Sequence, residues 1–356
     1  MIGVLDRLKD PGYLGPARQY QRARLWGQGL GVLLDPLALT LVYLSAGRAF
    51  ANAWHVFALA AGLSAGHSAI ALLTSRRAGL RAGLVVQGFA SWLADQAKGT
   101  GLALLMHLGY WAVLRYLFGV PLWWVWAGLA VPLALAVGIM LHPVLIMRLY
   151  HRLRDLEDEG LAGRLRAIAA KAGYRLTAVR VMNMSRRSRG ANAMATGLGG
   201  TRRIVISDTL LERFTCGEIE AIMAHELAHH RLAHIPRGLA RAVVGSLAVH
   251  WAAALTGPAT AGGMYLWVRL VGAWGMLLAE PVLLWNSRRC ERACDDLAVD
   301  WSSEPTAMAT ALARLGQQNL ADPWPPRLSE WLFYSHPPIG YRVERAAARA
   351  SKPDGA

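Results

Sequence analysis

Long apolar stretches with few charges constrain the fold of this chain more than any other feature of its sequence. They lie at roughly 25–45, 56–73, 100–118, 121–147, 236–256 and 264–285. About 20 residues of helix cross the hydrocarbon core of a bilayer, so each stretch can form a span. Charged residues make up only 17% of the chain, whereas soluble domains carry about a quarter. The sequence therefore predicts a predominantly α, polytopic helical membrane protein with six spans.

Ionisable residues interrupt several of these predicted spans, namely Asp35, His67, Arg115 and Glu280. A charged group at membrane depth is expected to face a protein-lined or watery interior rather than lipid. For Asp35, which Pro36 follows, a kink or an interfacial position is an equally good interpretation.

The net charge of +15 could indicate a nucleic-acid partner. However, the chain has no compact basic domain with an aromatic stacking platform, and no cysteine and histidine spacing typical of a zinc finger. We therefore expect no nucleic-acid partner. The basic residues are better interpreted as a signal of membrane topology.

This topology follows from where the basic residues lie. With four spans before residue 148, the N-terminus, the 74–99 loop, the 148–224 region and the C-terminal tail share one side of the membrane. They contain 32 of the 38 Lys and Arg residues, so the positive-inside rule makes that side cytoplasmic. The three cysteines predict no disulfide framework and suit a reducing compartment. The Ala-, Arg- and Gly-rich composition suggests a bacterium, and hence a multi-pass protein of a bacterial plasma membrane with both termini in the cytoplasm.

The central region between the fourth and fifth spans has a different texture. Residues 150–172 are charged and helical in pattern, AVRVMN at 178–183 reads as a strand, and residues 191–208 read as two strands around a Gly-Gly turn. Thr215 and Glu218 form a capping box that begins a helix. Pro236 interrupts or kinks this helix. We expect a small α+β domain with a short β-sheet.

The segment HELAH at 225–229 is the strongest chemical signal in the chain. On a helix, His225 and His229 are one turn apart on the same face, so both imidazoles can bind one metal ion. Glu226 lies beside them, where its carboxylate can take a proton from a water molecule that zinc activates. This pattern predicts a zinc peptidase site; the alternative is a pair of structural histidines.

A catalytic zinc needs a third protein ligand and an open position for water. In the segment ERACD, Glu291 and Asp295 are four residues apart, so both carboxylates lie on one face of a helix. We predict Glu291 as the third ligand and Asp295 as the acceptor of a hydrogen bond from a ligand imidazole. The alternative is a solvated acidic face, or ion pairs with Arg288 or Arg292.

Other potential ligands lie close to these residues. His234 follows His229 by five residues, one fewer than in the all-histidine pattern H-E-x-x-H-x-x-G-x-x-H, and the glycine of that pattern is absent. We therefore expect His230 and His234 to lie on the helix surface or to support a ligand. A thiolate ligand from Cys290 or Cys294 is conceivable, although buried free cysteines usually act as small apolar side chains.

Several segments together resemble the type I CAAX prenyl protease family, the integral-membrane gluzincins that also include the bacterial heat-shock membrane metalloproteases. The similar segments are ASWLADQAKG at 90–99, ANAMATGL at 191–198, the stretch from RRIVISD to HELAHH at 202–230, SRRCERACDDLAVD at 287–300 and SHPPIGYRVE at 335–344. The resemblance implies that His225, His229 and Glu291 hold one zinc ion per chain and that Glu226 is the general base.

The same resemblance assigns further residues to the substrate. Asn192 and Ala193 would lie on an edge strand that pairs with the substrate backbone, and His336 and Arg342 would line the cleft and stabilise the oxyanion. Spacing alone leaves the roles of His336 and Arg342 open. The chain departs from the family at Ala228, where a glycine is common, and in its six predicted spans, where the eukaryotic enzymes have seven.

We therefore expect four regions. Residues 1–149 would form an N-terminal membrane region with about four spans, and 150–234 a cytoplasmic zincin-type core. Residues 235–286 would add two spans, and 287–356 would supply the helix of the third ligand and a segment of the cleft.

The expected activity is that of a zinc metalloendopeptidase acting on peptides or membrane-associated proteins near the cytoplasmic face. One alternative is site-specific maturation of a dedicated leader or signalling peptide. An alternative of another class is a catalytically silent membrane scaffold or a zinc-dependent sensor, although such a protein has no need for Glu226. The expected partners are the lipid bilayer and a peptide or membrane-protein substrate, and the sequence makes no prediction of oligomeric state.

Overall fold

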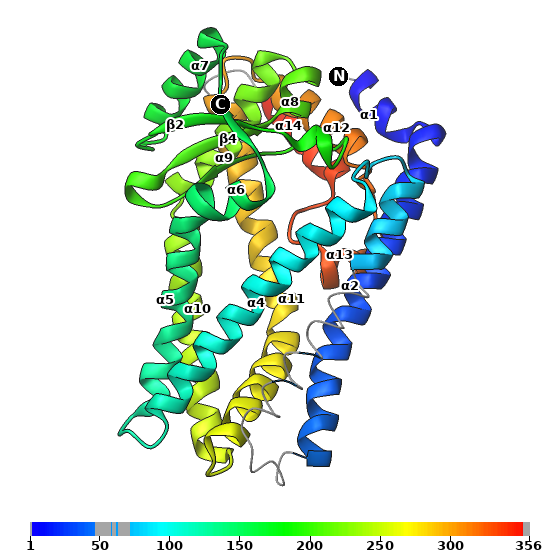
Figure 1. Ribbon diagram of the computed structural model, residues 1–356. Coiled ribbons are helices and arrows are strands. Elements are labelled where there is room, and N and C mark those ends of the chain that lie inside the picture. The colour runs from blue at the N-terminus through cyan, green and yellow to red at the C-terminus, as the bar shows by residue number, and fades with distance from the viewer. Residues whose placement is uncertain (1, 47–57, 59–61, 63–71, 352–356) are drawn as a thin grey trace.

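A computed structural model describes residues 2–46, 58, 62 and 72–351. Long helices form an elongated bundle, and a globular part that contains the β-sheet lies at one end of it (Figure 1). The predicted fold class, predominantly helical with a small α+β part, is confirmed.

Five long helices build the described bundle: α2 (Pro11–Ala46), α4 (Phe89–Leu117), α5 (Trp123–Leu141), α10 (His234–Thr256) and α11 (Ala261–Trp301). α5 packs against α10, while α11 packs against both α2 and α10. Large side chains fill the centre of the bundle, among them Leu39, Trp111, Leu114 and Tyr265. These buried groups form a core that is separate from the core of the globular part.

The outer surface of the bundle is apolar. Leu133 on α5, Leu255 on α10 and Leu278 on α11 are 65%, 67% and 77% exposed. Large contiguous apolar surfaces are rare where a protein meets water, so this surface suits contact with lipid.

Within the described residues, four helical segments are long and apolar enough to cross a membrane: Pro11–Ser45, Trp123–Tyr150, His234–Thr256 and Ala261–Trp301. They contain the spans predicted at 25–45, 121–147, 236–256 and 264–285. The span predicted at 100–118 forms part of the helix α4, which is not one of these four. Most of the span predicted at 56–73 lies outside the described residues.

The sheet of the globular part has four strands in the order β1-β2-β4-β3. β2 (Ala178–Met182) pairs in parallel with β4 (Arg203–Ser207), and β3 (Ala193–Thr196) pairs with β4 in antiparallel fashion. These three strands are those that the sequence predicts. Gly197 follows β3 with a φ of 93°, and a Cβ there would collide with the Thr201 carbonyl, so this turn requires glycine.

The prediction of a helix over residues 150–172 is wrong at its start. β1 (Leu153–Asp155) pairs there with β2, and α7 (Glu159–Lys171) begins only after Asp158, whose side chain caps the helix at the backbone N–H of Leu161. Charged residues at these positions are compatible with a strand because β1 forms the edge of the sheet.

Short elements connect the sheet to its surroundings. The π-helix η1 (His142–Ile146) and α6 (Met147–Tyr150) lead from α5 into β1. The 3₁₀ turns η2 (Met184–Arg186) and η3 (Gly199–Thr201) lie in the connections between the strands, and α8 (Asp208–Arg213) follows β4.

α9 (Cys216–Arg231) is the central helix of the globular part. The predicted capping box is present, since Thr215 accepts from the Glu218 backbone N–H and the Glu218 side chain accepts from the Thr215 N–H. The helix ends two residues before Ala233, which has a left-handed φ of 54°. α10 then starts in a new direction with Pro236 in its first turn, where proline is tolerated.

The C-terminal helices pack on one another and on α9 and α11. They are α12 (Ala307–Gln318), α13 (Arg327–Phe333) and α14 (Ile339–Ala350). α11 runs unbroken from the bundle into this part, so the predicted boundary at residue 286 lies inside one helix. The N-terminal helix α1 (Ile2–Lys9) and the first turns of α2 also belong here, because Leu8 and Tyr13 are buried in its core.

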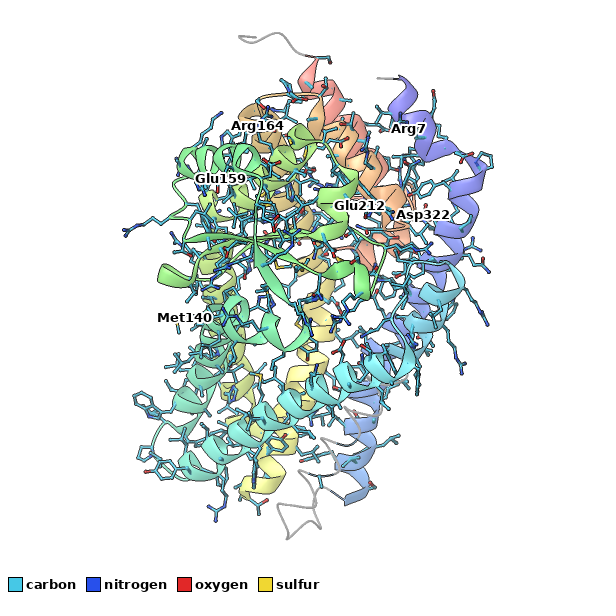
Figure 2. All side chains as sticks on the ribbon, turned by 45° about the horizontal axis from the view of Figure 1, so that its top comes forward. Arg7, Met140, Glu159, Arg164, Glu212 and Asp322 are labelled. Carbon is cyan, nitrogen blue, oxygen red and sulfur yellow. The ribbon has the colours of Figure 1, made fainter. Side chains whose placement is uncertain are left out.

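Charged side chains are unevenly distributed along the molecule. In Figure 2 the labelled residues Glu159, Arg164, Glu212 and Asp322 lie on the globular part, whereas Met140 lies lower, on the bundle. This separation places the polar chemistry of the chain at one end of an apolar bundle.

Candidate active site

The two histidines of the HELAH motif meet Glu291 between α9 and α11. His225 Nε2 lies 3.2 Å from Glu291 Oε2, His229 Nε2 lies 3.3 Å from Glu291 Oε1, and the two Nε2 atoms are 3.3 Å apart. His225 and Glu291 are buried, and His229 is partly exposed. The structure thus brings together the three residues that the sequence predicts as metal ligands.

These distances match the needs of a metal ion. Ligand bonds of about 2.0–2.1 Å in a tetrahedral zinc site place neighbouring ligand atoms about 3.3–3.4 Å apart. Burial alone would lower the pKa of His225, but its contacts with Asp295 and Glu291 outweigh burial and raise this pKa to about 9. The pocket therefore favours a positive charge between its ligands, as a cation site should.

Asp295 contacts His225 on the Nδ1 side of its ring, and Arg342 in turn holds Asp295. Asp295 Oδ1 lies 2.9 Å from His225 Nδ1, on the side of the ring away from Glu291. Arg342 donates to both oxygens of Asp295, over 2.9 Å from Nε and 2.7 Å from Nη2. The pair fixes the imidazole with its Nδ1 towards the carboxylate and its Nε2 towards the metal site.

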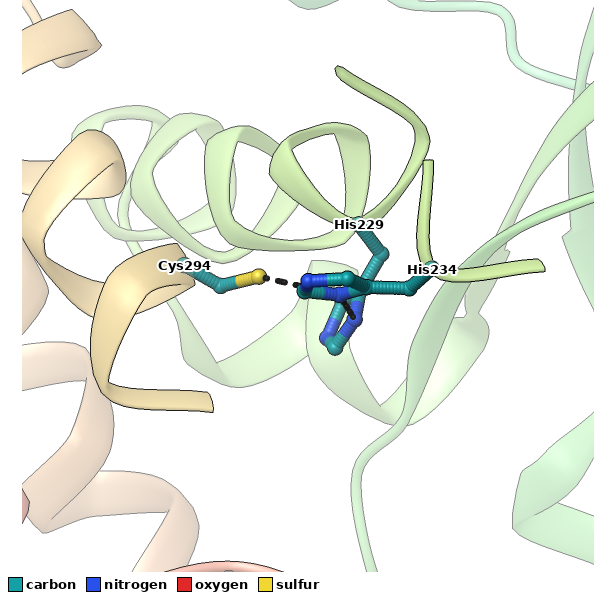
Figure 3. Close-up of side chains that lie close together, drawn as sticks. All are labelled: His229, His234 and Cys294. Atoms are coloured by element: carbon teal, nitrogen blue, oxygen red, sulfur yellow. Dashed lines mark hydrogen bonds between the residues drawn. The ribbon is translucent and has the colours of Figure 1, made fainter. Parts of the chain in front are cut away.

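His229 has a corresponding neighbour on the other side of the site (Figure 3). The Nδ1 atom of His229 lies 2.9 Å from Nδ1 of His234. Nδ1 of His234 also lies 3.8 Å from Sγ of Cys294. When His229 Nδ1 carries the proton and donates a hydrogen bond to His234 Nδ1, His229 Nε2 keeps a free lone pair for a metal. The sequence predicts that His234 lies on the helix surface or supports a ligand, and the left-handed turn at Ala233 brings the ring into a position where it can support His229.

The cysteines near Glu291 differ in position. All three cysteines of the chain are free, and Cys294 is buried whereas Cys290 is only partly so. Cys294 Sγ is near His229 and His234 but is not part of the His225, His229 and Glu291 group. The buried position of Cys294 agrees with the apolar role that the sequence favours.

Glu226 lines a cleft of about 270 Å³ next to these ligands. The same cleft is lined by Asn192, Ala193, His336 and Arg342. Burial raises the pKa of Glu226 above that of an ordinary glutamate, although the neighbouring histidines oppose the shift. The cleft therefore combines the Glu226 carboxylate, whose pKa is raised, with the four residues that the resemblance assigns to substrate binding.

The edge strand β3 borders this cleft. Ser207 N donates to Asn192 O over 2.9 Å, and in an antiparallel ladder the bonded residues alternate. Ala193 and Ala195 therefore turn their backbone groups away from β4. His230 Nε2 lies 3.2 Å from Ala195 O, so the backbone of Ala193 is the part of this edge that remains available.

His336 and Arg342 reach the site from the C-terminal segment. His336 Nε2 lies 3.4 Å from Glu291 Oε1, and its side chain is 55% exposed. Arg288 on α11 holds the preceding loop, because its Nη1 donates to the carbonyls of Glu330 and Tyr334 over 3.0 and 2.8 Å. The sequence assigned Arg288 at most to an ion pair, since nothing in its spacing indicates a contact with backbone 42 residues away.

Comparison with known proteins identifies the family. The model of peptidase family M48 matches residues 155–350, a stretch that contains α9, α11, α14 and the whole site. The chain belongs to peptidase family M48.

Three relatives of this M48 peptidase match between 40% and 75% of its length. An uncharacterized metalloprotease of Bacillus subtilis, YhfN, is 28% identical over 289 residues, which cover 75% of this chain and 67% of YhfN. A CAAX prenyl protease 1 homolog of Caenorhabditis elegans is 27% identical over 308 residues, covering 74% and 68%. CAAX prenyl protease 1 of Saccharomyces cerevisiae is 37% identical over 153 residues, covering 40% and 32%.

The fold has a counterpart among solved structures. The crystal structure of Ste24p from S. mikatae superposes with a TM-score of 0.75 and covers 95% of this chain and 89% of that chain, at 20% sequence identity. The M48 peptidase therefore shares the fold of Ste24p over nearly its whole length. Membership of the family, together with the four membrane-compatible helices, makes it a membrane metalloendopeptidase, and the family implies a metal cofactor.

Proposed function

We propose that this protein is a zinc-dependent endopeptidase that binds one zinc ion per chain through His225, His229 and Glu291. The observation that supports this most directly is the convergence of the two imidazole Nε2 atoms, 3.3 Å apart, on the Glu291 carboxylate, one of whose oxygens lies 3.2 Å from His225 and the other 3.3 Å from His229. A carboxylate, Glu226, lines the adjoining cleft. A catalytically silent scaffold or sensor has no use for this base.

With zinc bound, His225, His229 and Glu291 would hold a Lewis acid, which would lower the pKa of water and polarise the scissile carbonyl. Glu226 then takes the proton of the attacking water and returns it to the leaving amine. The raised pKa of Glu226 suits both steps, because a group that must accept and later donate a proton works best when its pKa approaches the working pH.

The C-terminal segment contributes the groups that bind the negative charge of the tetrahedral intermediate. His336 presents Nε2 beside Glu291. Arg342 uses Nε and Nη2 on Asp295, which leaves Nη1 as the nitrogen that can serve the substrate. Donors fixed in place before the reaction stabilise an oxyanion by several kcal/mol in enzymes of known mechanism.

We further propose that substrate binds as an added strand along β3. The outward backbone of Ala193 offers an N–H and a C=O, and Asn192 lies beside it on the exposed side. A second cavity of about 310 Å³ shares Asn319, His336 and Arg342 with the first and extends to α2. The two cavities together suit an extended peptide rather than a small molecule.

Asp295 and His234 act in this scheme as positioning residues. Each faces the Nδ1 atom of one ligand histidine, at 2.9 Å in both cases. Each thereby selects the tautomer whose Nε2 is free for zinc.

We place the active site at the cytoplasmic face of a bacterial plasma membrane. The excess of Lys and Arg on the side of the globular part supports this orientation. The apolar bundle fits a lipid bilayer as partner, and peptides or membrane-associated proteins as substrates near the membrane surface.

The substitution Glu226→Gln tests the proposal on purified, full-length protein. It removes the base while conserving shape and the three ligands, so we expect about one zinc per chain by metal analysis but a loss of cleavage of a quenched peptide of at least about 100-fold. Glu212→Gln is the matched control, since Glu212 is exposed on α8. Undiminished turnover by the Glu226 variant would sink the assignment of the base.

A further inference from the structure

A third, polar cavity lies apart from the two cavities at the active site. It has a volume of about 410 Å³ and lies between the first part of α4, the end of α6 and the turn η2. It shares no lining residue with the cavities at the active site. The proposed peptidase chemistry therefore gives it no role.

The lining of this cavity is strongly cationic. Five of its side chains are Lys98, Arg148, Arg152, Arg186 and Arg187, and none of its lining residues is acidic. Arginine forks and lysine ammonium groups are the side chains that bind phosphate oxygens best in proteins. Their number exceeds what a merely solvated loop region requires.

Asp95, just outside the lining, neutralises only two of these cations. It accepts from Arg187 over 2.9 and 3.3 Å and from Lys98 over 3.2 Å. Lys98 also donates to the Leu149 carbonyl over 2.9 Å. These bonds tie α4, η2 and the end of α6 into a preformed wall.

The other three arginines remain uncommitted. Within the described residues, the side chains of Arg148, Arg152 and Arg186 form no ion pair or hydrogen bond, and all three are exposed. In addition, Nδ1 of His151, another lining residue, is buried without a hydrogen-bond partner. The cavity thus offers three free positive charges and one unsatisfied polar atom to a ligand.

The surroundings of the cavity place it at the edge of the apolar bundle. The membrane-compatible segment Trp123–Tyr150 ends at its wall. Leu93 on α4 and Leu145 in η1 are 52% and 55% exposed nearby in the chain. Phe89 and Trp92 stack on each other at the start of α4, as aromatic residues do at membrane–water boundaries.

From these observations we propose that the cavity binds the phosphate of an anionic phospholipid. The phosphate lies among Arg148, Arg152 and Arg186, and the acyl chains follow the exposed apolar side of α4 and η1. A bound lipid holds the globular part against the membrane surface. A lipid phosphate is favoured over a free phosphate because the charged cavity adjoins the end of a membrane-compatible helix and exposed apolar side chains.

The test compares lipid binding by purified full-length protein and by the triple variant Arg148→Gln, Arg152→Gln, Arg186→Gln. Native mass spectrometry measures retention of dioleoylphosphatidylglycerol against dioleoylphosphatidylcholine. We expect wild-type protein to retain dioleoylphosphatidylglycerol preferentially. The triple variant should lose at least about tenfold in affinity for it, equivalent to about 1.4 kcal/mol.

A second triple variant, Arg7→Gln, Arg175→Gln and Arg213→Gln, removes the same charge from exposed positions outside the cavity. Equal losses in the two variants, or equal retention of both lipids by wild-type protein, would overturn the proposal. If millimolar inorganic phosphate displaces bound phosphatidylglycerol as effectively as added phosphatidylglycerol does, the cavity is a site for soluble phosphate, and the proposal of a lipid ligand is refuted. Cleavage of a soluble peptide in detergent should change less than about twofold in either variant, so a failure here is distinct from a failure of the peptidase assignment.

Discussion

Three Arg–Asp pairs between α14 and α11 allow a direct test of how burial sets the value of an ion pair. Arg342 pairs with Asp295, and further along the same two helices Arg345 pairs with Asp296 and Arg349 with Asp300. All three are bidentate, with N–O distances of 2.6–2.9 Å. The pairs differ in exposure: Arg342 and Asp295 are 11% and 1% exposed, while Arg349 and Asp300 are 40% and 41% exposed.

The substitution Arg342→Ala leaves the buried carboxylate of Asp295 without its cation. Removing one partner of a buried pair typically costs about 3–5 kcal/mol of the free energy of unfolding. We expect the lower end of this range, because His225 Nδ1 stays 2.9 Å from Asp295 and can share the charge. Arg349→Ala removes an exposed pair of the same geometry and should cost less than about 1 kcal/mol.

Chemical unfolding in mixed micelles, monitored by tryptophan fluorescence, measures both losses. The cost of Arg349→Ala should shrink further at high salt, since exposed pairs are screened, while that of Arg342→Ala should not. Only Arg342→Ala should also lower the zinc content. Equal destabilisation by the two variants, or a strong salt dependence of the Arg342 effect, would refute this reasoning.

Further predictions concern the site and its support. The substitution His234→Ala should weaken zinc binding by about 10–100-fold. The substitution His234→Asn should restore part of the zinc affinity through an amide acceptor, and the control His230→Ala should leave the zinc affinity unchanged. A normal zinc affinity of His234→Ala would contradict the positioning role of His234. The substitution Ala193→Pro removes the N–H of β3 that points away from β4, and it breaks no hydrogen bond of the sheet. The KM for a peptide should therefore rise several-fold at constant zinc content. An unchanged KM would argue against binding of the substrate as an added strand. Burial opposes but does not prevent the lowering of the Asp95 pKa by hydrogen bonds from Arg187 and other donors. The Asp95 carboxylate therefore stabilises the fold fully above about pH 4, which is the pKa of an aspartate in the unfolded chain. This stabilisation disappears as the pH falls through the pKa of Asp95 in the folded protein. Wild type and Asp95→Asn should therefore converge in unfolding midpoint on acidification, and parallel curves would speak against it.

The sequence by itself determined the features that depend on local geometry. Helical periodicity brings His225 and His229 to one face whatever the rest of the chain does, and the capping box at Thr215 begins α9 as predicted. Apolar stretches of the right length became membrane-compatible helices for the same reason, because bilayer thickness dictates their length. β2, β3 and β4 followed from alternation and turn residues.

Features that depend on distant partners escaped the local patterns. β1 is a strand only because β2 offers it an edge. His234 reaches His229 because a left-handed residue turns the chain between them. α1 and the first turns of α2 join the core of the globular part rather than a separate membrane region.

The active site divides along the same line. A helix places its own residues, so the HELAH pair could be predicted from spacing alone. Glu291, His336 and Arg342 come from segments 62 or more residues further along the chain, and only the packing of α11 on α9 and of α14 on α11 brings them within 3.2–3.8 Å of each other or of His225. The sequence could suggest these residues through resemblance, but their distances and the buried Arg342–Asp295 pair were decided by tertiary structure, because contacts between remote segments depend on how whole elements bury their apolar faces together.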